Sequence, residues 1–187
     1  PLLVVDGLVT KFDAADGVPF FVLDLVEGET LVKAGQRLGW EATVELLAQS
    51  LRSLAYLHQR GLIHMDLKPQ NLLVVEGRAG SQVKLIDLHL SRLRHVPHGA
   101  TMRGTIAYMA PEVVRGREVD ARADLYSLGA VAYEALCGKA PFAEAGSPMD
   151  VLRGHAQRSP LVFRARGVDD VPEALEEWVR CLLAKRP

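Results

Sequence analysis

The segment HMDLKPQN, at residues 64–71, brings three chemically active side chains within six positions of one another: Asp66, Lys68 and Asn71. Apolar runs on either side, Leu62–His64 and Leu72–Val75, predict short strands. A loop between two strands can aim all three side chains at one point. Transfer of a phosphoryl group needs such a set: a carboxylate that orients the nucleophile, a cation for the moving group, and a ligand for a metal ion.

A second acidic residue follows at a defined distance. Sixteen residues after Asn71, the apolar run VKLI leads to Asp87, whose carboxylate is a hard oxygen ligand suited to Mg²⁺. A solitary D-x-K would more often be a solvated surface pair. The ordered set of H-x-D-x-K-x-x-N, a strand ending in aspartate and a later GTIAYMAPE at residues 104–112 is very improbable by chance.

The remaining chain predicts the elements that must position these groups. Apolar residues at helical spacing, followed by Gly61 as a left-handed cap, predict a helix over Glu41–Arg60: Val44, Leu47, Leu51, Leu54 and Ala55. Strands are expected at residues 1–10, 19–26 and Gln82–Ile86, with a hairpin loop at 76–81. The first two strands are expected to be joined through a turn at Asp13–Gly17, and Lys11 is expected to be a surface residue of this connection. Residues 90–104 are expected to form a mobile loop. Further helices are expected at Asp124–Cys137, Met149–Gln157 and Pro172–Ala184. This order predicts a helix-rich α+β domain.

Composition excludes several classes of protein. The net charge is −1, with 22 basic and 23 acidic residues, so nothing indicates a nucleic-acid partner. No run of 18 apolar residues is present, so no membrane segment is expected in this chain. Cys137 and Cys181 lack metal-site spacing and are expected to be buried thiols, with a disulfide the less favoured alternative. We therefore expect a cytoplasmic protein.

These motifs, in this order and spacing, resemble those of the Hanks-type protein kinase superfamily, most closely its bacterial serine/threonine kinases. The resemblance runs from about Leu2 to Pro187. It implies a kinase-like fold in which residues 1–26 are a remnant of the N-lobe, with its last strands and the hinge. Residues 27–187 would be the helical C-lobe, incomplete at its C-terminus.

The resemblance also implies roles for individual residues. HMDLKPQN is similar to the catalytic loop, which makes Asp66 the base, Lys68 a partner of the γ-phosphate and Asn71 a Mg²⁺ ligand. Asp87, in DLH, matches the principal Mg²⁺ ligand. Three further matches concern the framework: Thr105 would tether the substrate-docking loop to the catalytic residues, Asp124 would hold the catalytic-loop backbone, and Ala110-Pro111-Glu112 would close the activation segment. ATP and Mg²⁺ are the implied cofactors.

The segment PFFVLDLVEGET resembles the nucleotide-binding hinge. By this match Leu23 takes the gatekeeper position, and the backbones of Asp24 and Val26 bond the adenine edge. Leu73 would pack beneath the adenine ring. Each of these residues, taken singly, is equally compatible with ordinary core packing, and only their register against the catalytic loop indicates a nucleotide.

The implied substrate is the serine or threonine hydroxyl of a protein. Lys68, two residues after the catalytic aspartate, is the serine/threonine signature of the family, and small-molecule kinases lack the APE-closed segment. Regulatory or sensor domains outside this stretch are compatible with the resemblance.

The sequence departs from the family pattern in several places. Met65 replaces the usual arginine, so a phosphate on Thr101 would lose its main partner, and His89 replaces a glycine. Only 18 residues precede PFFVLDLV, too few for the glycine-rich loop, the β3 lysine and the αC glutamate. We therefore expect these 187 residues alone to show no kinase activity. A pseudokinase-like scaffold or nucleotide-binding interaction module remains the alternative.

Overall fold

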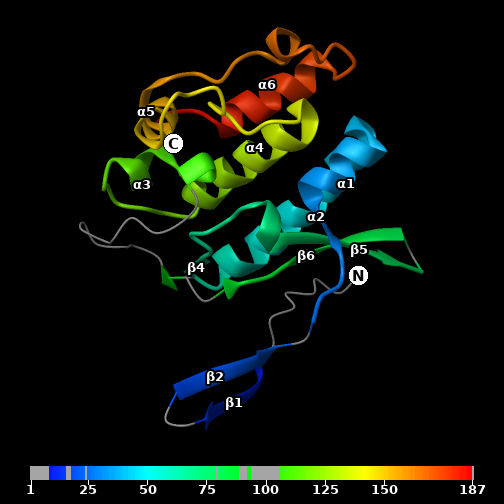
Figure 1. Cartoon of the computed structure of the whole chain (residues 1–187), viewed down its shortest axis with the longest axis vertical. Helices are drawn as coiled ribbons and strands as arrows, with labels where there is room; N and C mark the ends of the chain where they lie inside the picture. Colours follow the sequence, from blue (N-terminus) through cyan, green and yellow to red (C-terminus); the bar gives the residue numbers. More distant parts are fainter. Residues whose placement is uncertain are drawn as a thin grey trace.

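A computed structural model describes residues 9–15, 18–23, 25–78, 80–88, 92–93 and 106–186, with backbone alone for 9–23 and 92–93. Strands β1 (Val9–Ala15) and β2 (Val18–Leu23) form an antiparallel hairpin (Figure 1). Lys11 pairs with Val22 and Asp13 with Phe20, so the expected turn at Asp13–Gly17 and the place of Lys11 beside it are wrong. Backbone pairing continues until the chain must reverse, which shortened the turn that the polar residues had suggested.

A three-stranded antiparallel sheet is formed by strands that precede and follow the segment 64–71 in the sequence. Its order is β3 (Glu29–Thr30), β5 (Leu72–Gly77) and β6 (Gly80–Leu85), and Gly77 pairs with Gly80. The expected loop at 76–81 is therefore a tight hairpin. A separate pair joins β4 (Leu62–Ile63) to β7 (Arg92–Leu93), which falls inside the stretch expected to be irregular. The rest of 90–104 lies outside the described residues.

Helix α1 (Leu31–Leu38) was not expected from the sequence. Thr30 begins it, because its side-chain oxygen accepts a 3.3 Å hydrogen bond from the backbone N–H of Lys33. Gly35 weakens the helical signal but is required by packing: a Cβ there would lie 2.6 Å from the Thr43 hydroxyl of the next helix. A residue of low helix propensity thus allows α1 and α2 to approach closely.

Helix α2 (Trp40–Gln59) confirms the expected long helix, and Gly61 takes the expected left-handed conformation, with φ of 74°. The predicted buried face was partly wrong. Val44 is 39% exposed and Ala55 is exposed, whereas Leu46 and Leu57 are buried. The helix packs against both α4 and β6, so its buried face is rotated relative to a stripe chosen from apolar residues alone.

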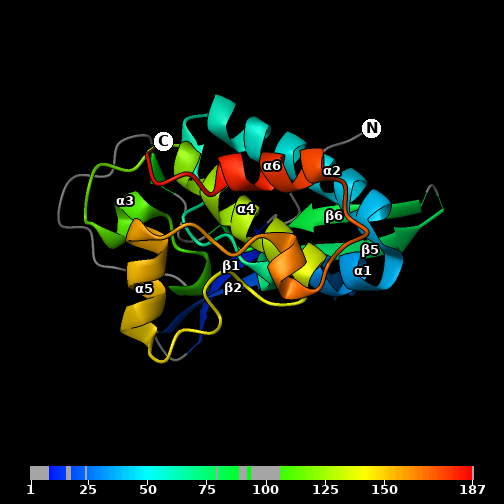
Figure 2. The same ribbon diagram turned by 90° about the horizontal axis from the view of Figure 1, so that it is seen from above.

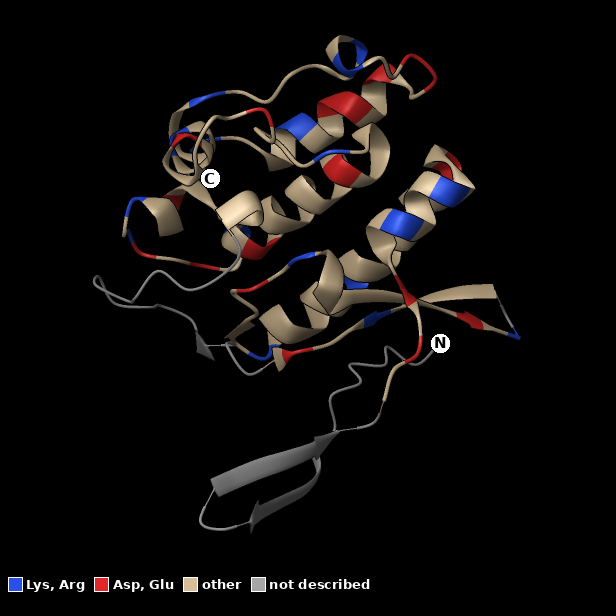
Figure 3. Ribbon diagram, in the orientation of Figure 1, with Lys and Arg blue, Asp and Glu red and all other residues tan. Residues whose placement is uncertain are grey.

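The later helices are α3 (Pro111–Val114), α4 (Arg122–Cys137), α5 (Pro148–Gln157) and α6 (Glu173–Leu182). Helix α4 is the centre of the fold, since it packs against α1, α2 and α6 (Figures 1 and 2). Most of it is drawn as uncharged in Figure 3. Gly129 permits this packing, because a Cβ there would lie 2.7 Å from Cβ of Leu182. No helix in the described ranges is long and apolar enough to cross a bilayer.

Both cysteines are free thiols, so the disulfide alternative is not formed. Cys137 is half-buried, and burial raises its pKa to about 12. Cys181 is exposed, which corrects the expectation that it is buried. It lies on α6 one residue before Leu182, and it is Leu182 that packs on α4.

Candidate active site

The first residues of the segment 64–71 are hydrogen-bonded to Asp124, a buried residue in the first turn of helix α4. Asp124, 1% exposed, accepts a 2.9 Å hydrogen bond from the backbone N–H of His64 through Oδ2. Its Oδ1 accepts a 3.0 Å bond from the N–H of Met65. These two bonds confirm the prediction that Asp124 holds this backbone. Met65 itself has φ of 70°, a strained value for a side-chain-bearing residue, and such strain persists only where the surroundings enforce it.

His58, near the end of α2, completes the anchorage. Its Nε2 lies 2.7 Å from Asp124 Oδ2, so one carboxylate links α2, α4 and the loop. This role could not be predicted from the sequence, because His58 lacks metal-ligand spacing and its partner is 66 positions away.

His64 is fully buried and fixes the loop to the end of β6. The backbone N–H of Asp66 lies 3.4 Å from His64 Nδ1, and since an N–H can only donate, Nδ1 is the acceptor. The ring proton is therefore on Nε2, which donates to the carbonyl of Ile86 at 3.1 Å. His64 therefore has a structural role: it holds the backbone of Asp66 and links the loop to the end of β6.

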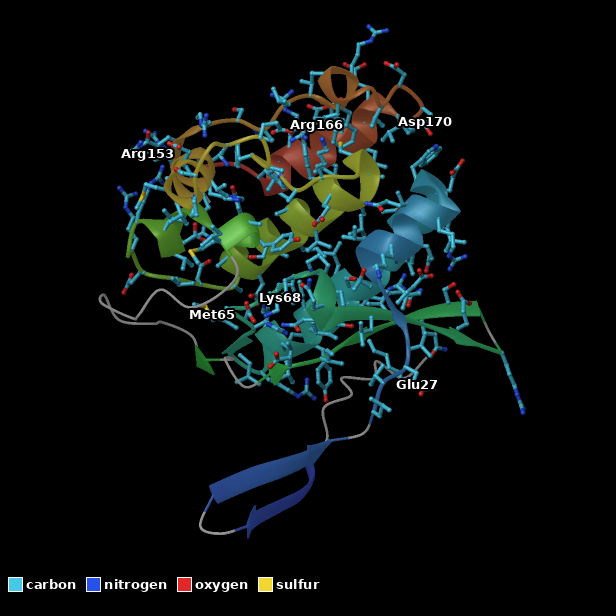
Figure 4. All side chains as sticks on the ribbon, in the orientation of Figure 1. Glu27, Met65, Lys68, Arg153, Arg166 and Asp170 are labelled. Atoms are coloured by element: carbon cyan, nitrogen blue, oxygen red, sulfur yellow. The ribbon has the colours of Figure 1, made fainter. Side chains whose placement is uncertain are left out.

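The three predicted catalytic side chains of this loop lie together. Lys68 Nζ donates to Asp66 Oδ2 at 2.5 Å, and Asn71 Nδ2 donates to the backbone carbonyl of Asp66 at 2.8 Å. In Figure 4 the labelled Met65 and Lys68 lie between α4 and the sheet. Asp66 is 7% exposed and Asn71 3%. Because the amide nitrogen of Asn71 is committed to Asp66, its Oδ1 is the atom available to a cation.

The pairing of β5 with β6 brings Asp87 beside this loop. Leu72 pairs with Leu85, and the register continues as the N–H of Ile86 donates to the carbonyl of Asn71 at 3.0 Å. Asp87 follows directly and has φ of 67°, a second strained position. Two oxygen-bearing side chains thus stand at adjacent points, a donor set that fits Mg²⁺. Among the described residues, no group of three or more His, Cys, Asp or Glu side chains is arranged for a metal.

The expected nucleotide hinge is described in part. Leu23 is the last residue of β2, with backbone alone, and Asp24 lies outside the described residues. Val26 is half-buried in the irregular segment that leads into β3, where Thr30 pairs with Leu73. Leu73 is half-buried on the face of β5 opposite the core residues Leu72 and Val74. The structure therefore brings the hinge segment next to Leu73, and the adenine role of both stays a prediction.

Helix η3 (Ile106–Tyr108) lies beside the loop at residues 64–71. Tyr108 and Met109 line the same small pocket as Met65 and Asp66. The hydroxyl of Ser127 donates to the carbonyl of Tyr108 at 2.8 Å, which ties η3 to α4. The Tyr108 hydroxyl donates to Glu134 Oε2 at 2.6 Å, and burial together with this carboxylate raises the pKa of Tyr108. Thr105, the predicted tether, precedes η3 and lies outside the described residues, as do His89 and Thr101.

Glu112 of the APE segment is 8% exposed, and loss of solvent raises the pKa of its carboxyl group. No salt bridge reaches it from the part of the chain that the structure describes. Two guanidinium groups act on it at longer range, those of Arg122 and Arg115, and Arg122 is itself bonded to Asp120.

The fold agrees with comparisons to known proteins. A family model described as protein kinase domain matches residues 9–187, and the chain belongs to this family. It is 36% identical over 178 residues to the serine/threonine-protein kinase PknB of Mycolicibacterium smegmatis, covering 91% of this chain and 28% of that protein. Serine/threonine-protein kinase Pkn1 of Myxococcus xanthus is 36% identical over 194 residues, covering 97% of this chain and 27% of the relative. PknB of Mycobacterium tuberculosis (strain ATCC 25618 / H37Rv) is 35% identical over 181 residues, covering 92% and 28%. The chain thus spans little more than a quarter of the length of these relatives.

Proposed function

We propose that this chain carries the catalytic region of a kinase that transfers the γ-phosphate of ATP to a serine or threonine hydroxyl of a protein. The observation that carries the proposal is the joint placement of three side chains on a loop fixed by Asp124, with Asp87 beside them: Asp66, Lys68 and Asn71. The serine/threonine kinases among the relatives support the substrate class, and membership of the family implies ATP use.

Asp66 is the group that would accept the proton of the substrate hydroxyl. Its backbone is held by His64 and by the Asn71 side chain, so its carboxylate is placed before a substrate arrives. Lys68 lies against this carboxylate, so the cation stands where negative charge grows on the transferring phosphoryl group.

Asn71 Oδ1 and the Asp87 carboxylate are the protein atoms that would hold Mg²⁺. When bound, this ion neutralises charge on the nucleotide phosphates. A site with few protein ligands would suit Mg²⁺, because this ion is usually held beside nucleotide phosphates by one or two carboxylate or amide oxygens of the protein. Val26 and Leu73 would contact the adenine, with Leu23 and Asp24 contributing from the adjoining hinge. A cytoplasmic location, where ATP is available, goes with this proposal.

The test is made on protein produced from the complete reading frame. Labelled γ-phosphate from Mg-ATP should pass to a generic basic protein or to the kinase itself, and acid hydrolysis should release labelled phosphoserine or phosphothreonine. Chelation of Mg²⁺ and the substitution Asn71→Ala should each abolish the transfer. Label found solely on tyrosine would contradict the substrate class. Nucleotide binding without any transfer would replace the proposal with a non-catalytic scaffold.

A further inference from the structure

A polar cluster lies buried behind η3, at the junction of α4, α5 and the turn that follows α6. His155 of α5 is 0% exposed, and its Nδ1 lies 2.9 Å from the hydroxyl of Tyr126 on α4. Lys185 donates to the same hydroxyl at 2.7 Å. The ring of Phe142 meets His155 edge-on, with centroids 5.0 Å apart, and closes the cluster. None of these groups takes part in the chemistry assigned above.

The hydrogen bonds of this cluster have one direction. Burial raises the pKa of Tyr126, so its hydroxyl keeps its proton. Lys185 occupies an acceptor position of that hydroxyl, and the hydroxyl hydrogen then points to His155 Nδ1. Burial also lowers the pKa of His155 to about 4, so the neutral ring carries its single proton on Nε2. The chain of donors runs from Lys185 through Tyr126 to His155.

The far end of this chain faces the substrate side of the active site. His155 Nε2 is buried and faces the backbone carbonyl of Ala107, which is close enough to oppose the effect of burial on the pKa of the ring but makes no hydrogen bond of normal geometry with it. Ala107 is the middle residue of η3, and its neighbour Tyr108 lines the pocket that contains Asp66. A buried N–H in a poorly aligned contact is unfavourable, so a small movement of η3 towards α5 would be stabilised by a well-formed hydrogen bond from Nε2 to the Ala107 carbonyl.

Lys185, the first donor in this row of hydrogen bonds, is held in place by contacts that do not involve η3. Arg115, which ends α3, donates to the backbone carbonyls of Ala156 on α5 and of Lys185, the latter at 3.1 Å. Lys185 Nζ also lies 4.9 Å from the centre of the Tyr126 ring and 5.0 Å from that of Phe142. The side chains of Lys185, Tyr126 and His155 are therefore held in fixed positions, and His155 can restrict the position of η3.

We propose that His155, oriented by Tyr126 and Lys185, is a positioning residue for the protein substrate: its Nε2–H bonds to the Ala107 carbonyl when a substrate docks against η3. This inference rests on the proposed function. It gives the hydrogen bonds that link Lys185, Tyr126 and His155 a role in substrate affinity and none in proton transfer, nucleotide binding or metal binding. Loss of the bond should raise KM for the protein substrate and leave kcat and KM for ATP within about twofold.

The test compares two replacements of His155 in protein produced from the complete reading frame. A glutamine amide places an N–H close to the position of Nε2, whereas leucine fills the space without a donor. His155→Leu should raise KM for a protein substrate about three- to tenfold, and His155→Gln should stay within about twofold of the parent. Tyr126→Phe, which removes the orienting hydroxyl, should shift KM in the same direction as leucine. Tyr133→Phe is the matched control, because Tyr133 is a fully buried tyrosine of the same helix whose hydroxyl donates to Leu161.

A readout that does not need turnover separates this inference from the proposed function. Nitrogen chemical shifts of His155 should show the proton on Nε2, and amide exchange at Ile106–Tyr108 should slow on addition of substrate in the parent and less so in His155→Leu. An active enzyme in which leucine and glutamine change KM equally, or in which His155 carries its proton on Nδ1, overturns the positioning role alone. A protein with the predicted tautomer but no kinase activity overturns the proposed function and the positioning role with it.

Discussion

The side chain of Asp124 holds Met65 in a left-handed backbone conformation: Oδ1 accepts a 3.0 Å hydrogen bond from the Met65 N–H, and φ of Met65 is 70°. Met65 immediately precedes Asp66, so this bond determines the position of the backbone that carries the proposed base. A strained residue next to a catalytic group is tolerated because a buried carboxylate compensates for the strain. The first prediction follows from this relationship.

Replacement of Asp124 by alanine should lower the free energy of unfolding by about 2–5 kcal/mol, because it leaves the N–H groups of His64 and Met65 without an acceptor inside the protein. Phosphoryl transfer should fall with it, since the loop loses its support. Urea titration and an activity assay measure the two effects. Asp169→Ala is the control: its ion pair with Arg164 is exposed, and its loss should change stability by less than about 0.5 kcal/mol. Equal effects of both substitutions would refute the anchoring role.

Gly28, within the segment that resembles the hinge, packs closely against the backbone of β5. A Cβ at this position would lie 2.6 Å from the backbone carbonyl oxygen of Val74, and neither backbone can yield easily. Gly28→Ala should therefore destabilise the protein by about 1–3 kcal/mol and weaken nucleotide binding, as the hinge segment is pushed away from β5. Gly146→Ala, where nothing lies within 4 Å of the added methyl group, should leave both quantities nearly unchanged. Thermal melting and titration with ADP provide the measurements, and unaltered ADP affinity in Gly28→Ala would argue against the position of the hinge.

Stability should depend on pH through His155. Its folded pKa of about 4 lies below the ordinary value of 6.5, so the unfolded chain binds more protons between these values. The free energy of unfolding should therefore decrease as pH falls from 6.5 to 4, by about 3 kcal/mol for this group. Lys185 stands beside the cluster as a cation, and Tyr126 stays neutral throughout this range.

Glutamine at position 155 supplies the comparison for this pH effect, since it does not titrate. Urea unfolding of His155→Gln between pH 7 and pH 4.5 should show a shallower decline than the parent. Parallel declines in the two proteins would show that His155 titrates normally in the folded state.

The geometry of the loop at residues 64–71 was predicted well because the information that determines it is local. Asp66, Lys68 and Asn71 lie within six positions, and two short apolar runs enclose them, so a loop between strands was the natural expectation. The same holds for α2, which ends at the expected left-handed Gly61, and for α4, which ends at Cys137 as expected and is followed by the left-handed Gly138. Local spacing and chain punctuation are sufficient for such features.

Other features depend on contacts that sequence spacing does not reveal. Helix α1 was missed because Gly35 reads as a helix breaker, and only the nearby Thr43 explains its presence. The bond between His58 and Asp124 joins residues 66 positions apart, and that between Lys185 and Tyr126 joins residues 59 apart. Polar partners of this kind are chosen by the packing of helices, so they become visible when the helices are placed.

The central claim is that Asp66 acts as the base of a protein kinase. The most direct test measures phosphoryl transfer to a protein substrate by the protein from the complete reading frame and by its Asp66→Asn variant, with nucleotide affinity determined in parallel. We expect kcat to fall about 10²- to 10⁴-fold while the affinity for ADP stays within about threefold, because Asp66 acts on the hydroxyl and not on the nucleotide. Undiminished transfer in Asp66→Asn would contradict the central claim.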